Sequence, residues 1–455
     1  MPRESSWSIA AIDHHLRRAV WVLAGVVAIA AGIVHAGKAA DERSAFIRWR
    51  PQVLDFWRGT NIYDRNMFPN PPILPITLYP LMTLPPVTGA MVWFTLKVAL
   101  TAASIALCFR WVRPEGRPLP SWFQAGVIVF ALRPILSDLH HGNNNLVILF
   151  LIVAMLEAWR RGYDVLAGLV LALAISFKVT PALFVPYFLY KRSWRTVGAT
   201  CLGMGLFLLV LPSLVLGPAF NGECLGMWWH RMLSPYLTKG AASPQEINQS
   251  MAGVLTRLLT ATRTGDGRYD VHIALNVVAW PPHVVRLLLK GLALGFVALL
   301  AFFCRTETKR RDDPRLLGEF ALIVLTMLFL SERSWKHHFV TVLLPFTYLM
   351  AQFAFTAPPR LKVRLLTTLA MWGSVFLMAT TSTEIGGLLA HGQGHKLAQG
   401  YGMFLWAAML LYVATAWRVV AGRHRVEVAP LLTGSAIPTP HFENGARRTS
   451  ALPLE

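Results

Sequence analysis

Long apolar segments separated by short polar loops form the main pattern along this chain. A helix needs about 20 apolar residues to cross a bilayer, and most segments approach that length. They predict an all-α, polytopic membrane protein of about 11 or 12 transmembrane helices. The number depends on residues 165–190, where Lys178 and Pro181 interrupt the hydrophobicity. The segments are residues 20–36, 90–109, 122–135, 146–159, 165–177, 197–216, 287–303, 317–330, 340–355, 366–380 and 404–420, with a short one at 181–190.

Residues 59–86 depart from this pattern, because they are rich in proline, asparagine and aromatic residues. Their prolines fix φ and remove backbone donors, so the stretch cannot form one plain helix. Residues 73–84 are nevertheless too apolar to lie in water. We therefore expect the outer loops, residues 37–88 and 217–286, to carry short amphipathic helices at the membrane face.

Basic residues of the short connecting loops all fall on one side if every segment is crossed in turn, and the positive-inside rule makes that side cytoplasmic. The N-terminus (residues 1–18) and a disordered tail (residues 423–455) are then cytoplasmic, flanking a transmembrane domain of residues 19–422. We expect a retained first span and a place in the cell (inner) membrane. The residues are Arg110, Arg113, Arg117, Arg160, Arg161, Lys191, Arg192, Arg195, Arg305, Lys309, Arg310, Arg311, Arg315, Arg360, Lys362 and Arg364.

Composition agrees with a membrane protein, since 55% of the residues are hydrophobic and 15% are charged. The formal net charge of +20 is spread over many loops, and no nucleic-acid-binding motif accompanies it. We expect no nucleic acid partner. The four cysteines form neither a disulfide framework nor a metal motif.

The first outer loop is itself basic, with Arg48 among its cations, and such side chains suit the phosphate of a lipid. Anionic phospholipid is an equally good explanation of these charges. Asp41 and Asp55 lie in the same loop, where a carboxylate could take a proton from an acceptor hydroxyl. Each could equally be a solvated loop charge.

A second polar cluster, residues 137–145, precedes an apolar segment and contains His140, His141 and three successive asparagines. Such residues are costly near lipid unless they face protein or a cavity. The adjacent histidines lack the i, i+4 spacing of a helical metal motif, so we expect no metal. Asn144 or Asn145 should also cap the helix that follows.

Two further clusters complete the candidates. Lys178 interrupts an apolar run, and an intramembrane lysine indicates a functional site unless it snorkels to the interface. Residues 331–338 combine Trp335, suited to a membrane interface, with His337 and His338, which can exchange protons near neutral pH.

Six motifs in the same order give the chain a resemblance to glycosyltransferase family 87. They are Gly59-x-x-Ile62-Tyr63 with Phe68-Pro69-Asn70-Pro71-Pro72, Leu78-Tyr79-Pro80-Leu81, Gly142-Asn143-Asn144-Asn145, Phe177-Lys178-x-x-Pro181, Asn248-Gln249-Ser250, and Ser331-x-x-Ser334-Trp335-x-His337-His338. The resemblance implies a GT-C type fold and inverting transfer of a mannose-like hexose or a pentose. The donor would be a polyprenyl-phosphate-linked sugar, the acceptor a lipid or glycan outside the cytoplasm, and membrane lipids the surroundings, with no cofactor.

The resemblance also implies roles for individual residues. Lys178 and outer-loop arginines such as Arg48 would hold the phosphate, and His337 or His338 would assist binding or proton transfer. The substrate cavity would be shaped by Asn70, Asn145, Asn248, Ser250 and Trp335.

One departure concerns the proton acceptor, because the family's expected acid falls near Ala45 in this chain. Asp41 or Asp55 could supply the base instead, or the acid could come from elsewhere. A transporter or flippase of a lipid-linked substrate, or a catalytically inactive member, is the alternative. Polar clusters at the outer ends of segments, without an internal repeat, favour the transferase.

Overall fold

The computed structural model describes residues 9–65, 68–114, 118–240, 243–262, 275–355 and 361–426, and helices are the regular elements of that part. In chain order they are α1 (Ile9–Ala40), α2 (Ala45–Trp57), α3 (Ile62–Arg65), α4 (Ile73–Met82), α5 (Pro86–Val112), α6 (Ser121–His141), α7 (Asn145–Arg160), α8 (Asp164–Phe177), the 3-10 turn η1 (Thr180–Leu183), α9 (Phe184–Tyr190), α10 (Trp194–Gly205), the π-helix η2 (Leu206–Val210), α11 (Leu211–Leu216), α12 (Pro218–Trp228), the π-helix η3 (Trp229–Leu233), α13 (Ser234–Lys239), α14 (Met251–Leu259), α15 (Pro282–Phe303), α16 (Pro314–Leu330), η4 (Lys336–Val342), α17 (Leu343–Phe355), α18 (Leu361–Ala379), η5 (Gly386–Leu388), η6 (Ala390–Gly392), α19 (Gly394–Gly400) and α20 (Met403–Val426).

The prediction of an all-α, multi-pass membrane protein is confirmed, although fewer helices are of full membrane length than expected. In the described residues, 8 helices are long and apolar enough to cross a bilayer. The expected 11 or 12 included α7 and α16, which have 16 and 17 residues and are almost wholly enclosed by other helices. The expected number also included residues 165–190, which are divided at Lys178 into α8 and the short α9.

The basic connecting loops meet at one end of the bundle, as the alternation of segments predicts. Glu157 at the end of α7 pairs with Arg110, Arg160 and Arg161. Asp164 at the start of α8 pairs with Arg311. The N-terminal part of α1 lies at this end too, since Ser121 donates its backbone N–H to Asp13 at 2.9 Å. We call the other end, where α1 finishes and α2 begins, the loop end.

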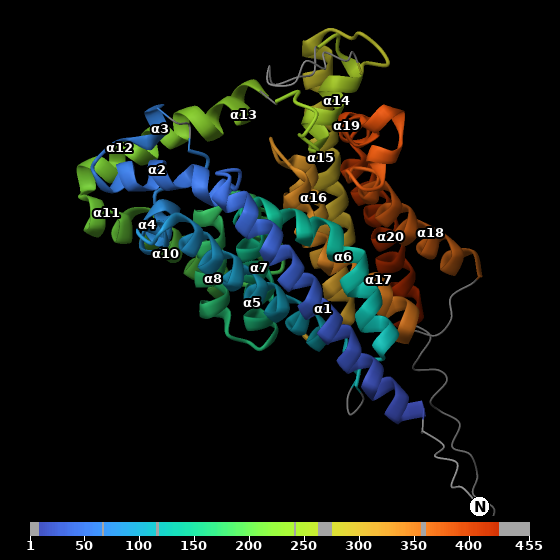
Figure 1. The fold of residues 1–455 in the computed structure, drawn as a ribbon. Helices are drawn as coiled ribbons and strands as arrows, with labels where there is room; N and C mark the ends of the chain where they lie inside the picture. The colour runs from blue at the N-terminus through green and yellow to red at the C-terminus, as the bar shows by residue number, and fades with distance from the viewer. Residues whose placement is uncertain are drawn as a thin grey trace, which may run out of the picture.

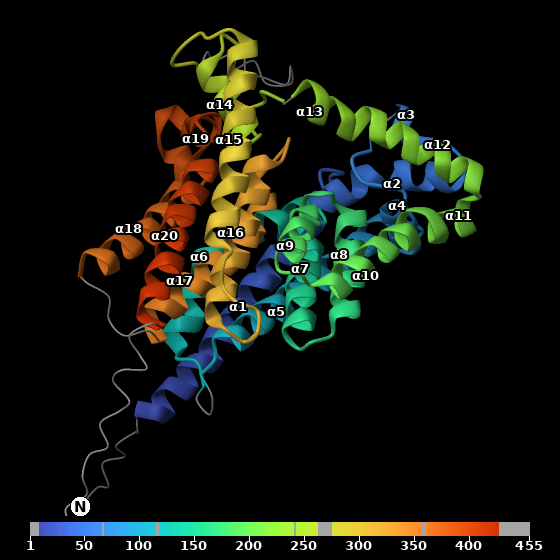
Figure 2. The same cartoon turned by 180° about the vertical axis from the view of Figure 1, so that it is seen from behind.

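Short helices lie across the loop end rather than along the bundle (Figure 1). They come from both long loops, α2 to α4 from the first and α12 to α14 from the second, and Figure 2 shows the same layer from behind. Trp228 of α12 donates to the carbonyl of Pro69 at 3.1 Å, so the two loops pack on each other. The expectation of short helices in these loops is confirmed.

Both terminal helices extend beyond the apolar segments predicted for them. The first helix, Ile9–Ala40, passes both ends of the predicted segment 20–36. The last helix reaches Val426, four residues into the predicted tail. The rest of that tail, residues 427–455, and residues 1–8 of the N-terminus lie outside the described residues.

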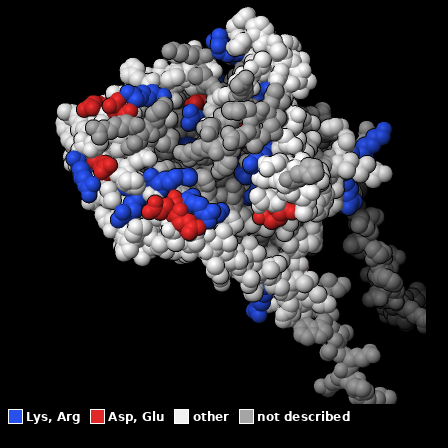
Figure 3. All heavy atoms as spheres, turned by 45° about the horizontal axis from the view of Figure 1, so that its top comes forward, with Lys and Arg blue, Asp and Glu red and all other residues white. Residues whose placement is uncertain are grey.

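The helices pack around a core to which α7 and α16 contribute nearly all their side chains. Close packing is clearest where α8 meets α10, because a Cβ on Gly168 would lie 2.4 Å from the carbonyl oxygen of Thr196. Figure 3 shows charged side chains gathered on the loop end, whereas the flank below it is almost free of them. That distribution suits a bundle whose sides face lipid.

Candidate functional site

Four buried or half-buried polar side chains join α5, α6 and α7 to the end of α8. Lys97 Nζ donates to Asp138 Oδ1 at 3.1 Å, and both side chains are fully buried. Asn145 Nδ2 donates to Asp138 Oδ2 at 2.9 Å, while Asn145 Oδ1 accepts from Lys178 Nζ at 2.6 Å. We call Lys97, Asp138, Asn145 and Lys178 the polar chain.

The turn between α6 and α7 places two members of this chain together. Gly142 ends α6 in the left-handed region, with φ 78°, which glycine adopts without strain. Asp138 then lies beside the first residue of α7 and accepts the backbone N–H of Asn145 at 3.2 Å. The expected capping by an asparagine side chain is wrong, because Asn144 holds the N-cap position without a side-chain capping bond.

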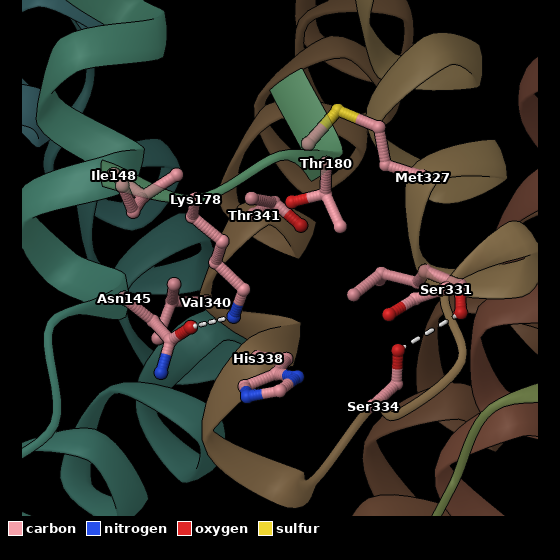
Figure 4. A pocket seen from close by; sticks show the side chains of 11 residues that line it. Asn145, Ile148, Lys178, Thr180, Met327, Ser331, Ser334, His338, Val340 and Thr341 are labelled. Atoms are coloured by element: carbon pink, nitrogen blue, oxygen red, sulfur yellow. Dashed lines mark hydrogen bonds between the residues drawn. The ribbon is translucent and has the colours of Figure 1, made fainter. Parts of the chain in front are cut away.

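Lys178 borders a small gap between α7, η1, α16 and η4 (Figure 4). Asn145, His338 and Ser334 line the same gap, and its volume is about 20 Å3. That volume accommodates about one water molecule. A phosphate group does not fit wholly within this gap, and the role of Lys178 as a phosphate ligand stays a prediction.

Burial lowers the pKa of the Lys178 ammonium from 10.5 to about 7, although nearby Asp138 opposes the shift. Between these two pH values the unfolded chain binds a proton that the folded protein releases. Stability therefore rises with pH over this window. We therefore expect the difference in melting temperature, wild type minus Lys178→Met, to increase from pH 7 to pH 9. A difference that stays constant with pH would contradict this prediction.

His141 and His337 lie between this gap and a larger cavity, and we call them the histidine wall. The rings of His141 and His337 stack with centroids 4.5 Å apart, and Asn143 Nδ2 lies 3.1 Å from His337 Nε2. Arg48 of α2 reaches the same wall, with its guanidinium 3.3 Å from His141 Nε2. His338 faces the small gap, and its Nδ1 lies 3.0 Å from the carbonyl oxygen of Arg333.

The larger cavity lies at the loop end and has a volume of about 380 Å3. Three cations line it, Lys38 from α1, Arg133 from α6 and Lys336 from η4. Arg133 donates to the carbonyl of Thr381 at 3.2 Å, whereas its buried Nε has no hydrogen-bond partner among the described residues. The other lining residues are Ser137, His140, His141, Ile247, Trp335, His337, Thr381, Thr383, Glu384 and Gln399. An anionic group of moderate size matches this lining in charge and volume.

Three residues expected to bind substrate instead hold loops in place. Asn70 Nδ2 donates to the carbonyl of Phe177 at 2.7 Å, which fixes the first loop beside Lys178. Asn248 donates to the carbonyls of Ser243 and Glu332. Ser250 caps α14 by accepting the N–H of Gly253 at 3.1 Å. None of these three side chains lines either cavity described above.

The carboxylates predicted to act as base also lie outside both cavities. Asp41 is exposed and pairs with Arg43 at 2.6 Å, and Asp55 is exposed and pairs with Arg58 at 3.2 Å. Ala45 is buried at the start of α2. His337 and Trp335 line the larger cavity, and their expected roles toward a substrate stay predictions. Within the described residues, no group of three His, Cys, Asp or Glu side chains could hold a metal ion.

Three residues of the site are absent from the sequence-based candidates. Lys97 and Arg133 lie within apolar segments, so the same argument that selected Lys178 could have found them. Glu384 lies in a polar loop after α18, where no local pattern distinguishes it from other exposed residues.

Comparison with known proteins finds similarity to membrane glycosyltransferases. A model of glycosyltransferase family 87 matches residues 68–331. A polyprenol-phosphate-mannose-dependent alpha-(1-2)-phosphatidylinositol mannoside mannosyltransferase of Mycolicibacterium smegmatis is 27% identical over 293 residues, covering 61% of this chain and 60% of that enzyme. The Mycobacterium tuberculosis protein of the same description is 25% identical over 288 residues, with 61% and 60% covered. The chain thus spans about three fifths of the length of these relatives.

Among solved structures, ArnT from Cupriavidus metallidurans bound to undecaprenyl phosphate is 15% identical, with a TM-score of 0.34. The match covers 92% of this chain and 81% of ArnT. A score of this size is too low to bear on the fold or the site.

Proposed function

Because the chain belongs to glycosyltransferase family 87, we propose that it transfers a sugar from a polyprenyl-phosphate carrier to a lipid or glycan acceptor. The relatives whose names describe polyprenol-phosphate-mannose as donor support a mannose-like sugar. The multi-pass, all-α architecture agrees with the GT-C type that the family implies.

The observation that carries this proposal is the cationic cavity at the loop end. It combines Lys38, Arg133 and Lys336 with the histidine wall in a volume of about 380 Å3. Charge-assisted hydrogen bonds from these side chains suit a phosphate that gains negative charge as it leaves the sugar. We assign the donor phosphate to these three cations, which replaces the assignment to Lys178.

The histidine wall and Trp335 then lie beside the sugar. The His337 ring can donate or accept a hydrogen bond there. Its Nε2 lies 3.1 Å from the Asn143 amide nitrogen, and the ring stacks on His141. Trp335 offers an indole N–H that has no partner among the described residues. An apolar rim would receive the polyprenyl chain, because the flanks of the bundle carry exposed leucine, valine and phenylalanine side chains.

We propose that the loop end faces outward from the cell membrane and that the basic end faces the cytoplasm. The support is the positive-inside rule applied to loops that share one end of the bundle. The termini of the described chain then belong to the cytoplasmic side.

A transfer assay with purified protein in liposomes tests the function. Radiolabelled polyprenyl-phosphate mannose and a pentose donor are offered with a phosphatidylinositol mannoside or a lipid-linked glycan as acceptor. The expected result is label in the acceptor and release of polyprenyl phosphate. Movement of the intact donor between leaflets without transfer of label would overturn the proposal in favour of a flippase, and no reaction with any donor would overturn it as well.

A further inference from the structure

An inverting transfer requires a proton acceptor near the acceptor hydroxyl. The resemblance described above puts the family's expected acid near Ala45, which has no carboxylate. The nearby carboxylates are engaged elsewhere. Asp41 and Asp55 are exposed and paired with neighbouring arginines outside both cavities. Asp64 pairs with Arg231 of η3. None of these three side chains lines the cationic cavity.

Asp138, a buried carboxylate that precedes His141 on α6, is not available as a base either. Lys97 and Asn145 occupy its two oxygens, and its side chain is fully buried. Protonation of Asp138 would leave Lys97 as an uncompensated buried charge. Asp138 is therefore a positioning residue of the polar chain.

Glu384 is the carboxylate that lines the cationic cavity. It is exposed in the loop between α18 and η5, and His140 and Trp335 line the same cavity. Its Oε1 accepts the hydroxyl of Thr383 at 2.9 Å, and its own backbone N–H and the Ser382 hydroxyl also hydrogen-bond to the carboxylate. No basic side chain of the described residues lies within ion-pair distance of it, so it remains open to a ligand.

We propose that Glu384 is the general base of the transfer, acting from a C-terminal loop in place of the missing first-loop acid. The inference rests on the proposed function. As the acceptor oxygen attacks the anomeric carbon, its proton passes to the Glu384 carboxylate and the new C–O bond forms. The bond from the anomeric carbon to the phosphate oxygen breaks, and its electron pair leaves with the polyprenyl phosphate, which Lys38, Arg133 and Lys336 hold.

The surroundings of Glu384 keep it ionised and therefore able to accept a proton. Its own backbone N–H and the Thr383 hydroxyl lower its pKa most, and Arg133 adds a smaller effect. The charged and titratable groups that face it are Lys38 of α1, Arg133 and His140 of α6, Lys336 of η4 and His395 of α19. A carboxylate with a lowered pKa is ionised and can accept a proton, and the same shift makes it a weaker base than an unperturbed glutamate.

The test compares Glu384→Gln and Glu384→Asp with the wild type in the transfer assay, with Glu307→Gln as the matched control. Glu307 is an exposed glutamate at the opposite end of the bundle, paired with Lys309. We expect Glu384→Gln to lower kcat by about 10²- to 10⁴-fold with a nearly unchanged KM for the donor, as for the loss of a general base. Glu384→Asp should retain part of the activity, and Glu307→Gln should match the wild type.

A second variant separates the chemical role from a structural one. Glu384→Ala should bind polyprenyl phosphate like the wild type, keep its melting temperature, and regain part of its kcat when formate is added as a diffusible base. Full kcat in Glu384→Gln would overturn the inference, as would a loss of kcat on Asp41→Asn or Asp55→Asn of the size expected for Glu384. An inactive wild type would instead overturn the proposed function, so the two failures are distinguishable.

Discussion

Asp138→Asn is expected to lower the free energy of unfolding by about 3–5 kcal/mol, the cost of breaking a buried ion pair. Asp138 and Lys97 have no exposed side-chain surface and lie 3.1 Å apart. Removing the carboxylate leaves the Lys97 ammonium buried with no counter-charge, because the Asp138 backbone carbonyl and the new amide oxygen are neutral acceptors. Thermal unfolding of the purified protein in detergent, followed by circular dichroism or a thiol-reactive dye, measures the loss.

Two controls distinguish a buried charge from a general loss of contacts. Asp55→Asn removes an exposed pair with Arg58, so it should cost less than about 1 kcal/mol. The double variant Lys97→Met with Asp138→Leu removes both charges and should recover much of the stability, because apolar replacements of a buried pair are often neutral. A drop for Asp138→Asn no larger than that for Asp55→Asn would contradict the prediction.

Lys336→Met is expected to reduce kcat/KM for the polyprenyl-phosphate donor by about 10- to 150-fold, the equivalent of one charged hydrogen bond. Lys336 begins η4, lines the cationic cavity and has no ion-pair partner among the described residues. The N–H groups of its ammonium can therefore donate to a phosphate oxygen. Initial rates of transfer at several donor concentrations measure the effect.

The matched control is Lys309→Met, which removes an exposed lysine at the opposite end of the bundle. It should leave kcat/KM within about twofold of the wild type, because surface pairs contribute little. Arg133→Met should act in the same direction as Lys336→Met. Unchanged kinetics in both cavity variants would show that the donor phosphate binds elsewhere, and a selective loss in Lys178→Met would return it to the smaller gap.

The sequence is sufficient for the fold class because apolar segments of bilayer length are a strong local signal. It also places residues 137–145, Lys178 and residues 331–338 at the outer ends of apolar segments. The structure brings these three stretches together at the histidine wall and the polar chain. The separation of α8 and α9 coincides with the interruption that Lys178 and Pro181 make in the sequence, whereas the exact ends of the helices were not predicted.

The sequence alone does not predict which polar residues join the polar chain and which hold loops in place. Asn145 joins the polar chain, whereas Asn248 holds two loops, and nothing in their local patterns separates these roles. Arg133 could have been selected as a charge within an apolar segment, but its place in the cavity could not be predicted. Glu384 reaches the cavity only because α18 and α20 bring the loop between them over α6, and that placement arises from tertiary packing alone.

The amide of Asn145 links the two halves of the polar chain, with its NH2 directed to Asp138 and its oxygen to Lys178. If the amide were turned over, its NH2 would face the Lys178 ammonium, donor against donor, and its oxygen would face the Asp138 carboxylate. A change at one of the four positions therefore creates a mismatch that the next position must repair. Over evolutionary time these four residues should be inherited as a block, and in an alignment of close relatives they should vary together or remain unchanged.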